Sequence, residues 1–99
     1  MKRHLNVHAG EVLREEFLFP LNITARELAK RAKLPQRLLN QIPNEEGRIT
    51  AEADLCLCTF FSLRPGYWLR LQLAHELRDA VQQVGAKIKA TVRPLGKRG

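Results

Sequence analysis

Apolar residues recur at helical spacing along most of this chain, and proline or glycine residues separate the helical stretches. The first stretch spans residues 9–18, and its inward positions are Val12, Leu13 and Phe17. Because proline disrupts a helix interior, Pro20 is predicted to end this helix.

Two short helices with a tight turn between them are predicted for residues 24–32 and 35–42. Thr24 can cap the first helix through its hydroxyl, and Pro35 suits the first position of the second, where no N–H is needed. One face of the second helix is apolar, with Leu38, Leu39 and Ile42. The other face carries side chains that can hydrogen-bond base edges: Gln36, Arg37, Asn40 and Gln41. This arrangement is typical of a DNA-binding helix-turn-helix.

Two further helices complete the expected all-α fold. Thr50 is predicted to cap a helix over residues 51–61, and Pro65 is predicted to begin a helix that runs to about Gln83. Gly85 would then end it. The alternation of apolar and polar residues from Ile88 to Leu95 predicts a short strand or an extended arm.

The last predicted helix has two apolar stripes, although a surface helix of a monomer needs only one buried face. The first stripe contains Tyr67, Trp68, Leu71 and Ala74, and the second contains Leu69, Leu73, Leu77, Ala80 and Val84. The second stripe predicts a homodimer whose interface includes Leu69, Leu73, Leu77 and Ala80. The alternative is that the C-terminal tail folds back over it.

The length and the net charge of the chain indicate how many domains it forms and what its C-terminal tail can do. A chain of 99 residues is expected to form one domain, with a core over about residues 8–84 and a basic tail over residues 85–99. The net charge is +7, but five of the 17 basic residues and no acidic residue follow Asp79. The tail is thus either a solvated end or a phosphate-contacting arm. Without a long apolar run or a signal peptide, a cytoplasmic protein is expected.

The reactive side chains do not predict an enzyme or a metal site. Cys56 and Cys58 would point about 200° apart on a helix, and the histidines at 4, 8 and 75 do not complete a ligand set. Glu15 and Glu16 are adjacent and are expected on the surface, and no glycine-rich phosphate loop occurs. We therefore expect no catalytic residue, no metal and no cofactor.

Several segments together resemble the HigA antitoxin family, also called VapI-like, within the larger Xre or lambda-repressor-like group. These segments are His8-Ala-Gly-Glu-Val-Leu-Arg-Glu-Glu-Phe-Leu, Pro20-Leu, Ile49-Thr-Ala-Glu, Phe60-Phe61 and Pro65-Gly-Tyr-Trp-Leu-Arg-Leu-Gln72. The similarity extends from residue 8 to about residue 78. It implies a five-helix homodimer that binds double-stranded DNA at a palindromic operator in its own promoter. It also implies a partner, a HigB-type toxin that cleaves mRNA.

The resemblance also assigns roles to single positions. Residues 35–42 match the recognition helix, and Thr24 and Arg26 match phosphate-contacting positions. The full predicted DNA-binding set is Thr24, Arg26, Lys33, Gln36, Arg37, Asn40, Gln41 and Arg48.

The chain departs from the family pattern at positions that bear on DNA binding. Lys33 stands where the turn usually has glycine, and Glu45 and Glu46 follow Asn44 where glycine and basic residues are usual. Asp54 replaces a small apolar residue. Two carboxylates beside a phosphate backbone oppose binding. Two alternatives therefore remain open: a helix-turn-helix protein that binds mainly another protein, and a solitary regulator without a toxin.

Overall fold

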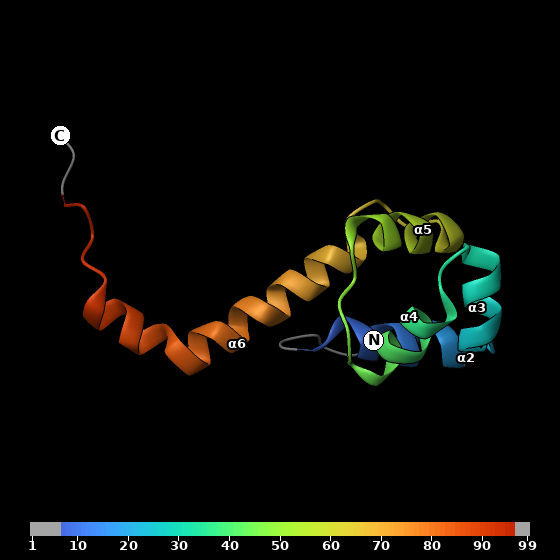
Figure 1. The fold of residues 1–99 in the computed structure, drawn as a ribbon, viewed down its shortest axis with the longest axis horizontal. Coiled ribbons are helices and arrows are strands. Elements are labelled where there is room, and N and C mark those ends of the chain that lie inside the picture. Colours follow the sequence, from blue (N-terminus) through green and yellow to red (C-terminus); the bar gives the residue numbers. More distant parts are fainter. Residues whose placement is uncertain (1–6, 97–99) are drawn as a thin grey trace.

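The computed structural model describes residues 7–96, which form five helical segments and, within that range, no strand. The first segment joins α1 (Ala9–Val12), the π-helical turn η1 (Leu13–Leu18) and α2 (Phe19–Leu21). Next come α3 (Ala25–Ala32), α4 (Gln36–Gln41) with the 3-10 turn η2 (Ile42–Asn44), α5 (Ala51–Phe61) and α6 (Tyr67–Thr91). The predicted five-helix, all-α fold is confirmed. A compact head contains the first four of these segments and the start of α6, which projects from it as a long arm (Figure 1).

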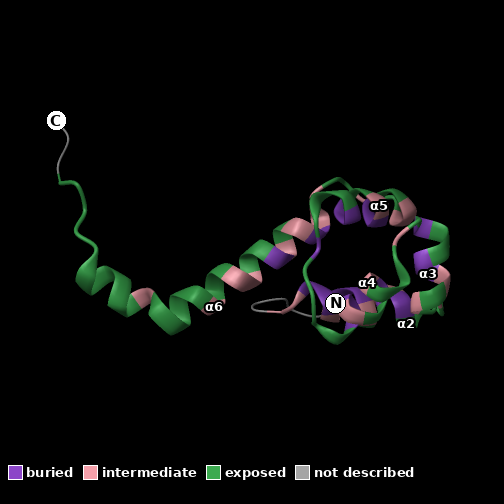
Figure 2. Ribbon diagram, in the orientation of Figure 1, coloured by how far each residue is buried: buried purple, intermediate pink, exposed green. Residues whose placement is uncertain are grey.

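The core fills the head and ends at the first turns of α6 (Figure 2). Its fully buried large side chains come from every segment, and they include Leu13, Leu28, Leu39, Leu57 and Trp68. The rings of Phe17 and Trp68 lie 5.0 Å apart, so the first segment packs directly on the start of α6. Leu13, Leu39 and Trp68 are among the inward positions that helical spacing predicts. No helix within residues 7–96 is both long and apolar enough to cross a membrane.

Three predicted roles of proline are wrong at the level of single residues. Pro20 does not end the first helix, because it follows the π-helical turn η1 directly and the helical conformation continues to Leu21. Pro35 is the N-cap of α4, with an extended ψ of 138°, and not its first helical residue. Pro65 lies in a turn before α6, whose N-cap is Gly66 at φ 95°, a conformation that favours glycine.

The predicted end of α6 is also wrong. The helix continues through Gly85 to Thr91, and the chain becomes extended only from Val92. A glycine inside a helix costs about 1 kcal/mol relative to alanine, which the favourable helix formers on both sides of Gly85 offset. The strand or arm predicted from Ile88 is therefore mostly helix. Residues 92–96 are exposed, so this described part of the tail does not fold back over α6.

A buried carboxylate fixes the start of α6. Asp54 of α5 is 2% exposed and accepts three backbone N–H groups: Oδ2 from Gly66 at 2.6 Å, and Oδ1 from Trp68 at 2.9 Å and Leu69 at 3.1 Å. The first N–H groups of a helix have no partner within it, so these bonds satisfy groups that would otherwise be buried without one. The unusual acid at this position thus caps a neighbouring helix.

A second connection joins α6 to the segment that follows the recognition helix. The side chain of Gln72 is buried and bonds both backbone groups of Ile49: Oε1 accepts from the N–H at 2.8 Å, and Nε2 donates to the carbonyl at 3.0 Å. The side chain of Gln72 therefore satisfies both the backbone N–H and the backbone carbonyl of Ile49. It sets the position of the arm relative to the chain that leaves η2.

His8 and His75, which are far apart in the sequence, meet in the structure. Their ring centroids lie 5.1 Å apart, and His8 caps α1 by accepting from the Gly10 N–H at its Nδ1, at 2.9 Å. Burial first, and the neighbouring His75 second, lower the pKa of His8 from its ordinary value of 6.5. Among the described residues, no group of three or more His, Cys, Asp or Glu could hold a metal ion; His4 lies outside them.

We predict that Asp54→Ala lowers the free energy of unfolding by about 2–4 kcal/mol, because three buried N–H groups lose a charged acceptor. Urea denaturation followed by circular dichroism measures this loss. Glu52→Ala is the matched control, since Glu52 is an exposed acid in the same first turn of α5. Equal losses in the two variants would contradict the assigned role.

We also predict a dependence of stability on pH that His8 causes. Because the folded pKa of His8 lies below 6.5, its contribution is complete above pH 6.5 and is lost as the pH falls through the lowered folded value. His8→Asn keeps a capping acceptor but removes this titration. Urea midpoints of the wild type should therefore fall more between pH 7 and pH 5 than those of His8→Asn, and parallel curves would refute the prediction.

Candidate nucleic-acid interface

The two helices α3 and α4 form the predicted helix-turn-helix. Thr24 caps α3, because its Oγ1 accepts from the Glu27 N–H at 3.0 Å. Lys33 ends α3 in the left-handed conformation at φ 61°, and the Leu34 N–H returns to the Ala29 carbonyl at 2.9 Å. The turn therefore keeps the backbone geometry that glycine favours. Lysine adopts this geometry at a cost of about 1 kcal/mol.

The recognition helix α4 presents three polar side chains to solvent. Gln36, Arg37 and Asn40 are all exposed, and Gln36 Nε2 donates to Asn40 Oδ1 at 2.9 Å. With this bond formed, the side-chain carbonyl oxygen of Gln36 can still accept a hydrogen bond, and the side-chain amide of Asn40 can still donate one. An acceptor and a donor therefore lie side by side. Amides in this arrangement can bond an adenine edge, and the guanidinium of Arg37 can bond a guanine edge.

Gln41 does not belong to that face. It is half-buried and lies against the loop after η2, where a Cβ added to Gly47 would come within 2.9 Å of its Oε1. Its backbone carbonyl accepts the Glu46 N–H at 2.9 Å. Helical spacing places Gln41 beside Asn40, but the reversal of the chain at residues 42–47 covers its side chain. The structure thus supports Gln36, Arg37 and Asn40 as the outward set, without Gln41.

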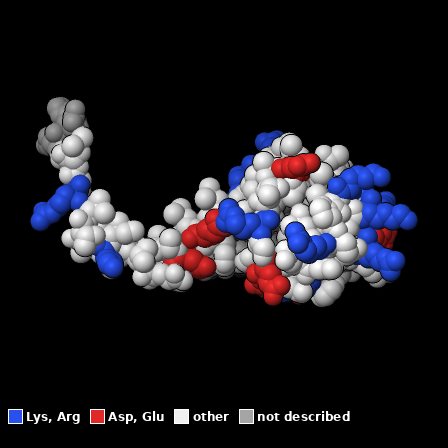
Figure 3. Space-filling model, viewed as in Figure 1, with Lys and Arg blue, Asp and Glu red and all other residues white. Residues whose placement is uncertain are grey.

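Arg48, another predicted DNA-binding residue, lies in the loop after the recognition helix. Its side chain is exposed but forms an ion pair with Glu76 of α6, so it connects the loop to the arm. To contact a phosphate, Arg48 would have to leave this pair. Thr24, Arg26 and Lys33, by contrast, lie exposed on the helix-turn-helix, where basic side chains of α3 gather at one end of the head (Figure 3).

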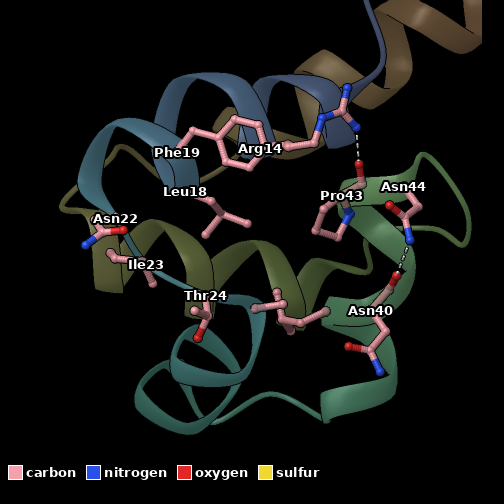
Figure 4. Close-up of a pocket in the computed structure, with 11 residues that line it drawn as sticks. Arg14, Leu18, Phe19, Asn22, Ile23, Thr24, Asn40, Pro43 and Asn44 are labelled. Carbon is pink, nitrogen blue, oxygen red and sulfur yellow. Dashed lines mark hydrogen bonds between the residues drawn. The ribbon is translucent and has the colours of Figure 1, made fainter.

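The acidic loop after η2 is partly neutralised from within the head. Arg14 of η1 donates to the Pro43 carbonyl (Figure 4). Its Nη2 lies 3.6 Å from Glu45 Oε2. A side-chain hydrogen bond to Glu15 first, and the nearby acids, raise the pKa of Arg14. Glu45 itself is in the left-handed conformation at φ 65°. Arg14 thus holds the loop against the first helix and offsets one of its two charges.

A surface hollow of about 730 Å³ lies between the first segment and α4 (Figure 4). Its apolar lining includes Leu18, Ile23 and Leu39, and its polar lining includes Asn40 and Asn44. Asn44 Nδ2 donates to the Asn40 carbonyl at 3.0 Å, which holds the end of the recognition helix. The hollow therefore adjoins the helix-turn-helix surface.

No family model matches the chain, but individual proteins do. Virulence-associated protein I of Dichelobacter nodosus is 38% identical over 76 residues, which cover 77% of this chain and 70% of that protein. Antitoxin HigA-1 of Vibrio cholerae is 32% identical over 89 residues, or 90% of this chain and 83% of the antitoxin. This chain belongs to the HigA family of helix-turn-helix antitoxins.

Solved structures of two antitoxins have the same fold. The Pseudomonas aeruginosa antitoxin HigA, solved with the higBA promoter, has a TM-score of 0.85 and 31% identity, and the match covers 92% of this chain and 99% of that one. Antitoxin GraA in complex with its operator has a TM-score of 0.87 and 35% identity, with 98% and 99% covered. The long α6 is thus part of the region shared with these antitoxins.

Sequence reasoning missed two features that position the recognition helix in this HigA-family chain. Arg14 is one, because nothing in the spacing of the first helix shows that it reaches Pro43. Gly10 is the other: a Cβ there would lie 1.8 Å from the Ile42 carbonyl oxygen, so only glycine allows α1 to approach η2 this closely. The small residues at the start of α1, Ala9 and Gly10, were the available signal.

We predict that Glu46→Lys strengthens DNA binding and steepens its salt dependence, because the exposed loop beside α4 changes from repelling to attracting phosphates. The expected gain is about three- to tenfold at low salt, measured by fluorescence anisotropy. Glu46→Gln is the matched control: it removes the negative charge without adding a positive one, and it should give a smaller gain. Unchanged affinity in both variants would place the loop away from the DNA.

Proposed function

We propose that this protein is a sequence-specific DNA-binding antitoxin that represses its own promoter. The observation that carries the proposal is the exposed set on α4, where the Gln36–Asn40 amide pair stands beside Arg37. These side chains lie on the second helix of a helix-turn-helix, which is the element that enters a major groove. Two structural relatives are described with operator or promoter DNA, which supports the same use here.

In this proposal each part of the interface has a separate role. Arg37, Gln36 and Asn40 read base edges, whereas Thr24, Arg26 and Lys33 contact phosphates and hold α4 in register. The segment from residue 24 to residue 41 carries five basic residues and one acid, so it attracts the DNA backbone locally. The ion pair between Arg48 and Glu76 connects the loop that follows α4 and η2 to α6.

We further propose that the protein acts as a homodimer on a palindromic operator. Leu73 and Leu77 on α6 are 63% and 61% exposed, and Ala80 is exposed as well, which is the surface that a second copy would cover. Leu69 is half-buried and packs against the core of its own head, so it would lie at the edge of that interface. Two-fold symmetry of the dimer would match two inverted half-sites.

The proposed protein partner is a HigB-type toxin that cleaves mRNA, which the protein would neutralise in the cytoplasm. Membership of the HigA family and the name of the Vibrio cholerae relative support this partner. The proposal assigns no catalytic residue, metal or cofactor. The negative charges of Glu45 and Glu46 favour a second candidate function, in which the protein binds mainly its protein partner. A toxin gene next to the gene of this protein would favour either of these two functions over that of a solitary regulator.

We predict that Arg37→Ala costs about 1–3 kcal/mol of binding to the protein's own upstream DNA, because a bidentate contact to guanine is lost. Binding to a scrambled duplex should change little. Fluorescence anisotropy with both duplexes measures the two affinities, and Arg70→Ala is the control, since Arg70 is an exposed arginine on α6 outside the helix-turn-helix. An equal loss on both duplexes would mark Arg37 as a phosphate contact and count against base reading by α4.

A further inference from the structure

Arg48 lies where the loop after the recognition helix meets the arm α6. Its side chain is 67% exposed and forms an ion pair with the carboxylate of Glu76, which is 41% exposed. Basic and acidic side chains lie next to each other where the arm leaves the head (Figure 3). Arg48 is the only basic residue between Arg37 and Arg64. Its partner therefore decides how much positive charge this loop presents to DNA.

The loop that carries Arg48 lies directly against the recognition helix. The Glu46 N–H donates to the Gln41 carbonyl at 2.9 Å. Gly47, the residue before Arg48, is so close to Gln41 that an added Cβ would come within 2.9 Å of its Oε1. If α4 enters a major groove, this loop faces the phosphates that border the groove. The long side chain of Arg48 can extend toward them.

The backbone next to Arg48 is fixed, whereas its guanidinium is held only at the surface. Gln72 is buried and bonds both backbone groups of Ile49, the residue that follows Arg48. The guanidinium is exposed in its pair with Glu76, and a surface ion pair shifts an equilibrium by no more than about fivefold. A phosphate can therefore replace Glu76 as the partner of Arg48 while the loop stays attached to α6.

We infer that Glu76 is an electrostatic gate on DNA binding. In the free protein its carboxylate holds the guanidinium of Arg48, and in the complex a DNA phosphate takes the guanidinium while the carboxylate returns to solvent. Carboxylate and phosphate bind a guanidinium through the same N–H groups, so the two compete for Arg48. The inference rests on the proposed DNA binding. It adds to that function a residue of the arm, outside the helix-turn-helix, that lowers the affinity for DNA.

The gate requires opposite effects from the two partners of one ion pair. Glu76→Gln frees Arg48 for the phosphate and should tighten DNA binding about two- to fivefold. Arg48→Gln removes the phosphate contact and should weaken DNA binding. If the pair served only to hold the loop in place, either substitution would loosen the loop. Weaker binding by a similar factor in both variants would therefore overturn the gate.

A double variant separates this exchange from a general change in net charge. In an Arg48→Gln background, Glu76→Gln should give a much smaller gain in affinity, because no guanidinium remains to be released. Asp79→Asn is the matched control, since Asp79 lies about one turn further along α6 and pairs with His75. It removes the same charge from the arm and should change the affinity little. Equal gains from Glu76→Gln and Asp79→Asn, whether or not Arg48 is present, would contradict the gate.

Fluorescence anisotropy at several salt concentrations measures these affinities on the upstream DNA and on a scrambled duplex. A phosphate contact carries no sequence information, so each substitution should change the two affinities by the same factor. Arg48→Gln should also reduce the slope of log affinity against log salt by about one. An unchanged slope, or effects confined to the upstream DNA, would show that Arg48 does not pass to a phosphate.

The outcomes distinguish failure of this inference from failure of the proposed function. Selective binding to the upstream DNA without coupling between residues 48 and 76 would refute only the gate. Coupling of the same size on two duplexes that bind equally well would support the gate and refute sequence-specific reading by α4. The absence of binding to either duplex would refute both. Circular dichroism of each variant confirms that the head remains folded.

Discussion

Asp54 accepts three backbone N–H groups at the start of α6, and the relation between the head and the arm depends on these bonds. The arm begins after a turn in which Gly66 adopts φ 95°, so the helix has no capping side chain of its own. A carboxylate from α5 supplies that cap from inside the core. Without it, Trp68 would be buried beside unpaired N–H groups, and the direction of the arm would not be fixed.

The next two turns of α6 contact the loop beside the surface that is proposed to bind DNA. Gln72 lies one turn after the capped residues and holds Ile49 by both backbone groups, while Glu76, a further turn along, pairs with Arg48. The loop that leaves the recognition helix is therefore attached to α6 at two successive turns. If α6 joins two copies, the separation of their recognition helices follows from these contacts. Dimerisation and DNA reading would then share one rigid element.

Much of the fold follows from local pattern, because helices bury residues at fixed spacing. The caps at Thr24 and Thr50 and the inward position of Leu39 were predictable from neighbouring residues. The contacts that the sequence does not reveal are those between distant segments. Asp54 stands where the family pattern has a small apolar residue, and its partners lie 12 to 15 residues further along the chain.

For the same reason, the exposure of the candidate site residues follows from the sequence only in part. Gln36, Arg37 and Asn40 face outward because one face of α4 is apolar, and that is a property of the helix alone. The surroundings of Gln41 and Arg48 are decided by the fold of the next loop, which helical spacing does not describe. The predicted end of α6 at Gly85 is wrong because the helix formers on both sides of this glycine offset its cost within a helix.

The most direct test of this account is the salt dependence of binding to the protein's own upstream DNA, measured by fluorescence anisotropy against a scrambled duplex. The account predicts tight binding to the upstream DNA that weakens steeply as salt rises, with much weaker binding to the scrambled duplex at each salt concentration. Equal affinity for the two duplexes would contradict sequence-specific reading by α4. The protein partner would then be the main ligand.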